Sequence, residues 1–192
     1  IREKTKGLFI EGAPIVEVDS VSRRGLDELV QKIDEISEDI EEKKTDAPSR
    51  MSIDRVFSLK GFGTIVTGTL IEGKISVDDE MTIYPSEKKV KVRNLQVHGC
   101  DVKTAYAGQR TAINLSNIKV SEIQRGDVIA QTGSVEESMM IDVNISLVEH
   151  CKKSLKHWDR IRIFHGTKQI LCRIVPLNED EIQYGESGYA QL

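Results

Sequence analysis

The clearest pattern of apolar and polar positions in the chain lies within residues 54–69. An apolar run at 56–59 favours one strand, and a run of β-branched residues at 64–67 favours a second. Gly61 and Gly63 stand between the two runs, where a tight turn needs residues that reach positive φ at little cost. The pattern predicts a β-hairpin.

Strand patterns continue from residue 51 to residue 131, with turn residues and no helix between them. The second strand is long enough to bend at Gly68 and to help close a barrel. The alternation breaks at Arg93 and Asn94, which indicates a bulge. A series of short strands of this kind predicts a small antiparallel β-barrel. The expected strands are 53–59, 63–75, 80–85, 90–98, 110–117 and 127–131.

A second β-region follows a short connector. Alternating apolar residues predict a strand over 139–149, and two further strands over 160–164 and 168–177 meet at Gly166. Another strand begins at Gly188. Three or four strands are too few to close comfortably, so we expect a second barrel that is truncated at its C-terminal end.

The N-terminal segment has a different pattern. Apolar residues recur every three or four positions over 25–44 and predict a helix, with Lys43 and Lys44 in its last turn. The end of a helix over 1–8 and a strand over 14–18 precede it. A single strand has no sheet to join, so we expect the remnant of a larger α/β domain whose uncovered apolar surface favours self-association.

The expected fold class is therefore mainly β, with two small antiparallel β-barrel domains after a short α/β remnant. The three expected parts are residues 1–47, which include a linker, residues 48–133 and residues 134–192.

Composition agrees with an ordinary soluble globular protein. Of the 192 residues, 39% are hydrophobic and 30% are charged. No apolar run is long enough to cross a membrane, and no signal-peptide pattern opens the sequence. Three widely spaced cysteines form no CxxC pair, which favours a reducing, cytoplasmic location.

Charge is unevenly distributed behind a formal net charge of −4. Residues 17–46 carry eleven acids against five bases, whereas residues 150–175 carry seven bases against one acid. The basic block is either a solvated face or a phosphate-binding patch. Its cationic residues are Lys152, Lys153, Lys156, Arg160, Arg162, Lys168 and Arg173.

Two familiar kinds of site are not indicated. Residues 68–74 nearly match a phosphate-binding loop, but Ile75 replaces the hydroxyl residue that would hold magnesium, and the segment has strand composition. The histidines and cysteines have no metal-ligand spacing, so we expect no metal site.

Charged residues interrupt two expected strands of the first barrel. Asp54 and Arg55 stand inside an apolar strand, and Arg110 begins another. They could be exposed side chains at the barrel edge, with one surface salt bridge contributing roughly 0–1 kcal/mol. Alternatively, two guanidinium groups face a negative ligand and the aspartate orients them. Neighbours in a regular strand point to opposite faces, so such a pocket requires a bulge or a strand end at Asp54.

Seven segments share their motifs with a known family. They are residues 14–29, 54–69, 97–99, 107–110, 123–128, 164–167 and 185–192. Together they resemble the EF-Tu-like translational GTPases, and among these the selenocysteine-specific elongation factors (SelB). The resemblance implies the end of a G domain, a translation-factor β-barrel (domain II) and part of domain III. Asp19 and Ser20 fall in the guanine-contacting loop, as a nucleotide-binding remnant, where the family usually has Ser-Ala.

The resemblance also implies a function. Asp54, Arg55 and Arg110 match positions proposed to hold the selenocysteyl side chain of selenocysteyl-tRNA. A selenol is far more acidic than a serine hydroxyl, so guanidinium groups favour selenocysteine over its neutral seryl precursor. The implied role is binding of the aminoacyl end and the backbone of selenocysteyl-tRNA, for GTP-dependent delivery to the ribosome at recoded UGA codons. The basic residues of 152–173 become candidates for contact with the tRNA backbone.

Other parts of the family lie outside this sequence. Its phosphate loop, switch regions and guanine motif would precede Ile1, so the resemblance implies no enzymatic activity and no GTP or Mg in this chain, although the full-length protein would use both. The region that grips the selenocysteine-insertion mRNA hairpin would follow Leu192. Two other interpretations stay open: the barrels of a general EF-Tu or initiation-type factor, which need no cationic pocket, and a non-catalytic interaction scaffold.

Overall fold

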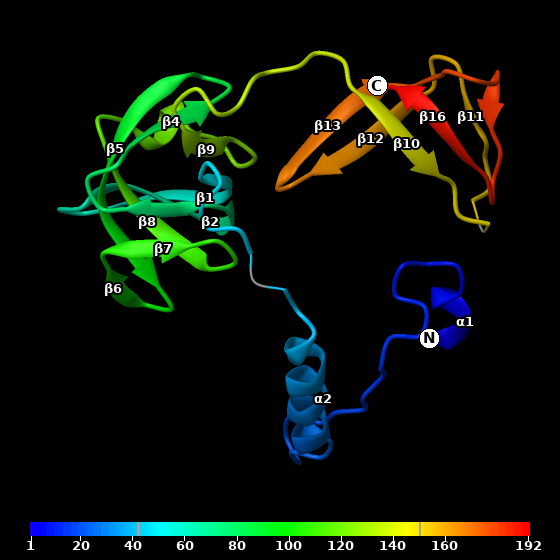
Figure 1. The fold of residues 1–192 in the computed structure, drawn as a ribbon, viewed down its shortest axis with the longest axis horizontal. Coiled ribbons are helices and arrows are strands. Elements are labelled where there is room, and N and C mark those ends of the chain that lie inside the picture. Colours follow the sequence, from blue (N-terminus) through cyan, green and yellow to red (C-terminus); the bar gives the residue numbers. More distant parts are fainter. Residues whose placement is uncertain (42, 150) are drawn as a thin grey trace. The chain divides into compact units, whose positions relative to one another are not determined.

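The chain is mainly β in a computed structural model that describes residues 1–41, 43–149 and 151–192 (Figure 1). It divides into two compact units, each assembled from separate stretches. Unit 1 comprises Ile1–Glu42, Asn144–His157 and Pro176–Ala190, and unit 2 comprises Lys43–Val143, Trp158–Val175 and Gln191–Leu192. The expected domain limits after residues 47 and 133 stay predictions.

Unit 2 contains a closed antiparallel barrel, which confirms the expected architecture. Its strands follow the order β4-β9-β1-β2-β8-β5, and β5 also pairs with β4, which closes the sheet on itself. The strands are β1 (Arg50–Leu59), β2 (Gly63–Glu72), β4 (Glu80–Tyr84), β5 (Lys88–Val97), β8 (Arg110–Ser116) and β9 (Val128–Gln131).

Side chains of isoleucine, valine, leucine and methionine fill the barrel. Along β2, every second residue from Thr64 to Leu70 is buried, as expected where one face of a strand lines a core. Met51, Ile53 and Ile113 are completely buried in the same cluster. This packing accounts for the low aromatic content of the chain.

The strand that was expected to run from 63 to 75 is interrupted at Gly73. A Cβ atom at this position would lie 2.4 Å from the carbonyl oxygen of Ala47, and Gly73 has a φ of +71°. The chain therefore turns there before β3 (Lys74–Ser76), which pairs with β7 (Thr104–Tyr106). Residues 68–74 are thus strand and turn rather than a loop that opens a helix.

Three short elements of the first β-region escaped the sequence pattern, because three residues are too few to show a period of two. They are β6 (Cys100–Val102), β7 and the 3₁₀ turn η1 (Val120–Glu122). The bulge expected near Arg93 is confirmed, because the pairing of β5 with β8 shifts between Val92 and Asn94.

In the second β-region, the described residues form seven short strands. The hairpin around Gly166 is confirmed by the pairing of β12 with β13, but the strand expected over 139–149 is reduced to β10. β10 is short because β16, its partner strand, has only five residues to pair with it. The strands are β10 (Asp142–Ser146), β11 (Leu155–Lys156), β12 (Arg160–His165), β13 (Lys168–Arg173), β14 (Val175–Pro176), β15 (Glu181–Ile182) and β16 (Ser187–Gln191).

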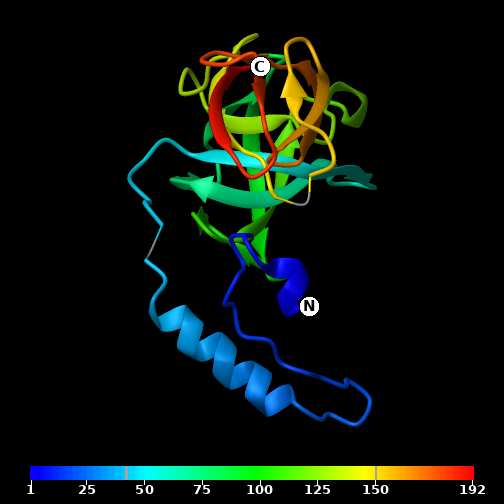
Figure 2. The same ribbon diagram turned by 90° about the vertical axis from the view of Figure 1, so that its right-hand side faces the viewer.

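The described part of the N-terminal segment contains the helices α1 (Arg2–Thr5) and α2 (Leu26–Glu38). Figure 2 shows α2 between two irregular stretches of chain. The helix is confirmed, but its expected extension to Lys43 and Lys44 is wrong. The acidic residues at its C-terminal end oppose the helix dipole, and no residue of α2 is buried, so little favours another turn.

The expected strand over 14–18 is wrong, since these residues have no regular secondary structure. A strand needs a partner for its backbone groups, and within the described residues this stretch pairs with none. The apolar stripe of α2 stays uncovered, with Val30, Ile33 and Ile36 between 50% and 57% exposed. None of the described helices has both the length and the apolar character that a membrane crossing requires.

Gly68 permits the close approach of β1 and β2. It lies opposite Ile53, and a Cβ atom at this position would lie 2.3 Å from the carbonyl oxygen of Ser52 and 2.8 Å from Cγ of Met51. The position therefore requires glycine because of this contact, and an added methyl group must displace the backbone of a neighbouring strand.

We predict that Gly68→Ala lowers the free energy of unfolding by about 2–3 kcal/mol, the usual cost of overpacking a well-filled site. Denaturant unfolding monitored by circular dichroism measures the change. Thr69→Ala, the exposed neighbour on the same strand, is the matched control and should stay within about 0.5 kcal/mol. Equal stability of the two variants would contradict the close contact at Gly68.

Candidate functional site

A β-bulge in β1 carries Asp54 into the candidate site. Ile53 pairs with Gly68, whereas Arg55 pairs with Thr67, so Asp54 is an extra residue without a partner on β2. At the bulge, successive side chains of β1 no longer alternate strictly between the two faces of the sheet. The structure thus supplies the irregularity that a pocket formed by neighbouring residues requires.

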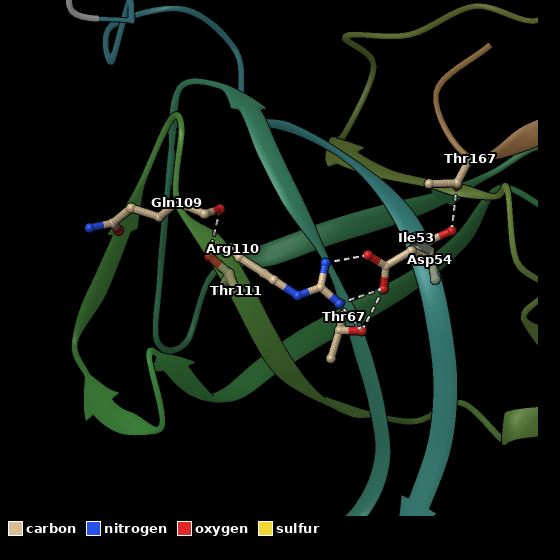
Figure 3. A network of polar contacts seen from close by, with 7 residues as sticks. All are labelled: Ile53, Asp54, Thr67, Gln109, Arg110, Thr111 and Thr167. Carbon is tan, nitrogen blue, oxygen red and sulfur yellow. Dashed lines mark hydrogen bonds and ion pairs between the residues drawn. The ribbon is translucent and has the colours of Figure 1, made fainter. Parts of the chain in front are cut away.

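Asp54 and Arg110 form a bidentate ion pair (Figure 3). Nη1 of Arg110 donates a short hydrogen bond to Oδ2 of Asp54, and Nη2 donates to Oδ1 at 3.1 Å. Oγ1 of Thr67 donates to the same Oδ1 at 2.7 Å. Both carboxylate oxygens are therefore satisfied, and the carboxylate fixes the guanidinium plane.

The surroundings keep Asp54 ionised. Burial raises the pKa of this carboxyl group, but the hydrogen bonds from Arg110 and Thr67 and the positive charges of Arg110 and Arg55 outweigh burial, so the pKa lies below its usual value. The carboxylate side chain is 21% exposed and the arginine side chain 51%. Arg110 thus presents part of its guanidinium group to solvent while Asp54 holds it from behind.

Arg55 lies beside this pair and is exposed. Within the described part of the chain, its side chain makes no hydrogen bond and no ion pair. Its charge still acts on the site, because it lowers the pKa of Asp54. Asp54 neutralises one of the two arginines, so the site keeps one uncompensated positive charge.

A hollow of about 260 Å³ opens next to Arg110. The sequence had not indicated most of its lining. His98 and Gly99 form the turn between β5 and β6, where both residues have positive φ, of 53° and 79°. The lining residues are Thr67, Gln96, His98, Gly99, Arg110, Thr111 and Ala112.

A second, smaller hollow of about 100 Å³ shares Gln96 and Ala112 with the first. Leu59, Phe62 and Ile65 give it apolar walls. Asn94 and Asn114 complete the lining, and Oδ1 of Asn114 is buried there without a hydrogen-bond partner among the described residues. A buried unpaired acceptor of this kind is suited to a ligand that carries an N–H or O–H donor.

The structure divides the basic block between the two units. In unit 2, Arg160 pairs directly with Arg173 across the β12–β13 hairpin, and Arg162 lies on the same face of β12. The guanidinium carbon of Arg173 lies 5.7 Å from the ring centroid of Trp158. Lys168 pairs with His165 and falls on the other face.

Lys152, Lys153 and Lys156 belong to unit 1. Nζ of Lys156 lies 3.2 Å from a carboxylate oxygen of Glu181, which partly neutralises its charge. The seven cations predicted to contact nucleic acid therefore belong to both units, and the exposed arginines of the hairpin form one group within unit 2.

The loop that contains Asp19 and Ser20 is held by hydrogen bonds between its own residues. The carboxylate of Asp19 accepts hydrogen bonds from Oγ of Ser22 at 2.6 Å and from the backbone N–H of Val21 at 2.9 Å, and both bonds lower its pKa. Over the described ranges, no group of three or more histidine, cysteine or acidic side chains is arranged to hold a metal ion.

Comparison with known proteins gives a consistent result. Residues 63–130 match the family described as elongation factor Tu domain 2. The chain is 39% identical, over 97% of its length, to the selenocysteine-specific elongation factor of Desulfomicrobium baculatum, of which it spans 29%. The chain thus covers less than a third of this relative.

Solved structures agree with this assignment. A bacterial selenocysteine-specific elongation factor, EF-Sec, superimposes with a TM-score of 0.77 at 27% identity, over 97% of this chain and 31% of that one. The apo form of translation elongation factor SelB from Methanococcus maripaludis shares the fold with a TM-score of 0.81, over 94% of this chain and 43% of that one, at 24% identity. Residues 63–130 therefore match elongation factor Tu domain 2, and nearly the whole chain is similar to part of a selenocysteine-specific elongation factor.

Proposed function

We propose that the hollow beside the Asp54–Arg110 pair binds the aminoacyl end of selenocysteyl-tRNA and distinguishes it from seryl-tRNA. The observation that carries the proposal is the bulge of β1. At the bulge, Asp54 holds the Arg110 guanidinium group in a fixed plane, and the charge of the neighbouring Arg55 acts on the same carboxylate. The similarity to relatives named as selenocysteine-specific elongation factors supports this choice of ligand.

Charge provides the discrimination. Selenocysteine is an anion at neutral pH, whereas the serine hydroxyl is neutral. The pair formed by Asp54 and Arg110 has no net charge, so the attraction for a selenolate comes from Arg55 and from the directed N–H groups of Arg110. A seryl group offers no charge to either arginine, so it does not form the charge-assisted hydrogen bonds that a selenolate accepts.

The geometry leaves donors available. A guanidinium group has five N–H donors, and those engaged here point to Asp54 and to the oxygen of Thr67. The remaining donors of Arg110 can meet a ligand in the hollow that this side chain lines. Because Asp54 fixes the guanidinium plane in advance, binding needs little additional ordering of the side chain.

The smaller hollow extends the proposal from the amino acid to the nucleotide that carries it. The amino acid of an aminoacyl-tRNA is esterified to the terminal ribose, so the terminal base lies close to it. The walls formed by Leu59, Phe62 and Ile65 suit the flat face of a base, and the free acceptor on Asn114 suits its amino group. The two hollows share Gln96 and Ala112 in their lining, which supports two adjoining subsites for one ligand.

We assign backbone contacts to the basic residues of 152–173, with the exposed arginines of β12 foremost. Arginine side chains neutralise phosphates without reading sequence. Arg160 and Arg162 stand on one exposed face of the hairpin together with Arg173. A face that carries three positive charges suits contact with the phosphates of a tRNA stem.

For the whole protein, we propose GTP-dependent delivery of selenocysteyl-tRNA to the ribosome at recoded UGA codons in the cytoplasm. GTP and Mg would be bound by a G domain, of which residues 1–47 would be the end. Contact with a selenocysteine-insertion mRNA hairpin would be made by a further part of the protein. The proposal rests on relatives of which this chain spans under a third.

We expect Arg110→Ala to weaken binding of selenocysteyl-tRNA about tenfold to a hundredfold, since it removes charge-assisted hydrogen bonds and leaves the Asp54 carboxylate facing the anion. Binding of seryl-tRNA should change much less. Parallel titrations of the two aminoacyl-tRNAs at fixed salt measure the ratio. Arg93→Ala, an exposed arginine of β5 in the same barrel, is the control. Equal losses for both tRNAs would refute the pocket.

Arg55→Ala should distinguish the effect of charge on tRNA selection from an effect on folding stability. Arg55 has no bonded partner within the described residues, so its loss should change the unfolding free energy by no more than about 0.5 kcal/mol while it reduces discrimination between the two tRNAs. Arg110→Ala leaves the Asp54 carboxylate unpaired and should cost about 1–3 kcal/mol in stability. Thermal unfolding beside the binding titrations tests the contrast. A loss of stability in Arg55→Ala equal to that in Arg110→Ala would argue against it.

Arg162→Ala should weaken the binding of both aminoacyl-tRNAs to the same extent. It should also reduce, by about one, the magnitude of the slope of log association constant against log salt concentration, as expected for a lost phosphate contact. The control is Lys88→Ala, because Lys88 is already paired with Glu122 on the barrel. A slope that matches that of the unmodified chain would exclude Arg162 from the interface with tRNA.

A further inference from the structure

The tip of the β12–β13 hairpin contacts β1 one residue before the bulge. Oγ1 of Thr167 donates a hydrogen bond of 2.6 Å to the carbonyl oxygen of Ile53 (Figure 3). The same oxygen accepts the backbone N–H of Gly126 at 2.9 Å. Two donors from distant parts of the chain therefore meet on one carbonyl group of unit 2.

The hairpin tip fits closely against the barrel. A Cβ atom on Gly166 would lie 2.6 Å from Oγ of Ser52, and one on Gly126 would lie 2.8 Å from Cβ of Lys168. Both glycines also have positive φ. A contact with so little free space restricts movement of the hairpin tip along β1.

The position of this contact on β1 makes it significant for the site. β1 pairs with β9 only from Arg50 to Ser52, and the register shift of the bulge begins after Ile53. The carbonyl group of Ile53 and the amide nitrogen of Asp54 belong to one planar peptide group. A donor that fixes the oxygen of Ile53 therefore fixes the plane from which the backbone of Asp54 continues.

We infer that Thr167 is a positioning residue for the pocket, because its hydroxyl group holds the peptide plane that sets the direction of Asp54. Asp54 in turn sets the plane of the Arg110 guanidinium group through the bidentate pair. The inference rests on the proposed function for its consequence in tRNA selection, but the geometric link from Thr167 to Arg110 can be tested without tRNA.

The positioning role of Thr167 also links the pocket beside Arg110 to the arginine face of the hairpin, both of which are proposed to bind the same aminoacyl-tRNA. The hairpin that carries Arg160, Arg162 and Arg173 ends in the residue that holds the bulge. A tRNA whose backbone lies along these arginines would therefore engage the same element that positions the pocket for its aminoacyl end.

Thr167 could serve only to attach the hairpin tip to the barrel, which we call a docking role. This role and the positioning role predict different effects when the hydroxyl group is removed. Without the hydroxyl group of Thr167, the oxygen of Ile53 keeps its bond from Gly126, so the barrel is left with no unsatisfied acceptor at this point. Docking alone therefore predicts a modest loss of stability and an unchanged site. Positioning predicts a changed environment for Arg110 even where the barrel stays folded.

The test uses Thr167→Val, which keeps the shape of the side chain and removes the donor, and Thr167→Ser, which restores the donor. Thr132→Val is the matched control, because it removes a hydroxyl–hydroxyl contact of 2.9 Å with Thr82 elsewhere in the barrel. One readout is the Nε–H signal of Arg110 in a ¹⁵N–¹H spectrum of this chain. The other is the ratio of the dissociation constant for seryl-tRNA to that for selenocysteyl-tRNA, which measures the preference for selenocysteine.

We expect Thr167→Val to shift or broaden the Arg110 signal and to reduce the ratio about fivefold, the effect of one lost hydrogen bond. Thr167→Ser should restore both, and Thr132→Val should change neither. An unaltered Arg110 signal in folded Thr167→Val would overturn the positioning role whatever the tRNA result. A shifted signal with an unaltered ratio would uphold the positioning and overturn instead the role of the pocket in selecting selenocysteine.

Discussion

The one extra residue in β1 is the constraint on which the site depends. Because of the register shift between Ile53 and Arg55, contact with the core resumes at Val56, so Asp54 and Arg55 both stand between two core positions. The carboxylate of Asp54 meets the guanidinium group of Arg110, 56 residues later in the chain, and the hydroxyl group of Thr67. A local irregularity of the backbone thus lies at the point where these three side chains meet.

The barrel makes this irregularity tolerable. Its closed sheet fixes β1, β2 and β8 against a core of completely buried apolar residues, so the cost of the bulge is met by packing elsewhere. A site built on strands is held more firmly than one built on loops. The exposed charges belong to the surface of a rigid scaffold, and their arrangement does not depend on a ligand to order it.

Much of the barrel could be predicted because its strands carry their own signals. The β-branched run of β2 and the break of phase at Arg93 both express local backbone preferences. The site depends on pairs that are far apart in the sequence, and periodicity carries no information on them. Thr167 and Ile53 are separated by 114 residues, and His98 enters the hollow only through a turn between β5 and a strand of three residues. Sequence reasoning named Asp54, Arg55 and Arg110 as charges out of place, but could not show which arginine the aspartate engages.

The turn at His98 and Gly99 has a consequence for recognition. Two successive residues with positive φ define the kind of two-residue turn whose twist matches that of the flanking strands, and few residue types other than glycine, asparagine, aspartate and histidine adopt it readily. The main chain itself therefore delivers the imidazole ring to the rim of the hollow. The backbone that carries this ring is already ordered in the turn. A ligand that contacts the ring therefore causes little further loss of backbone conformational entropy in the protein.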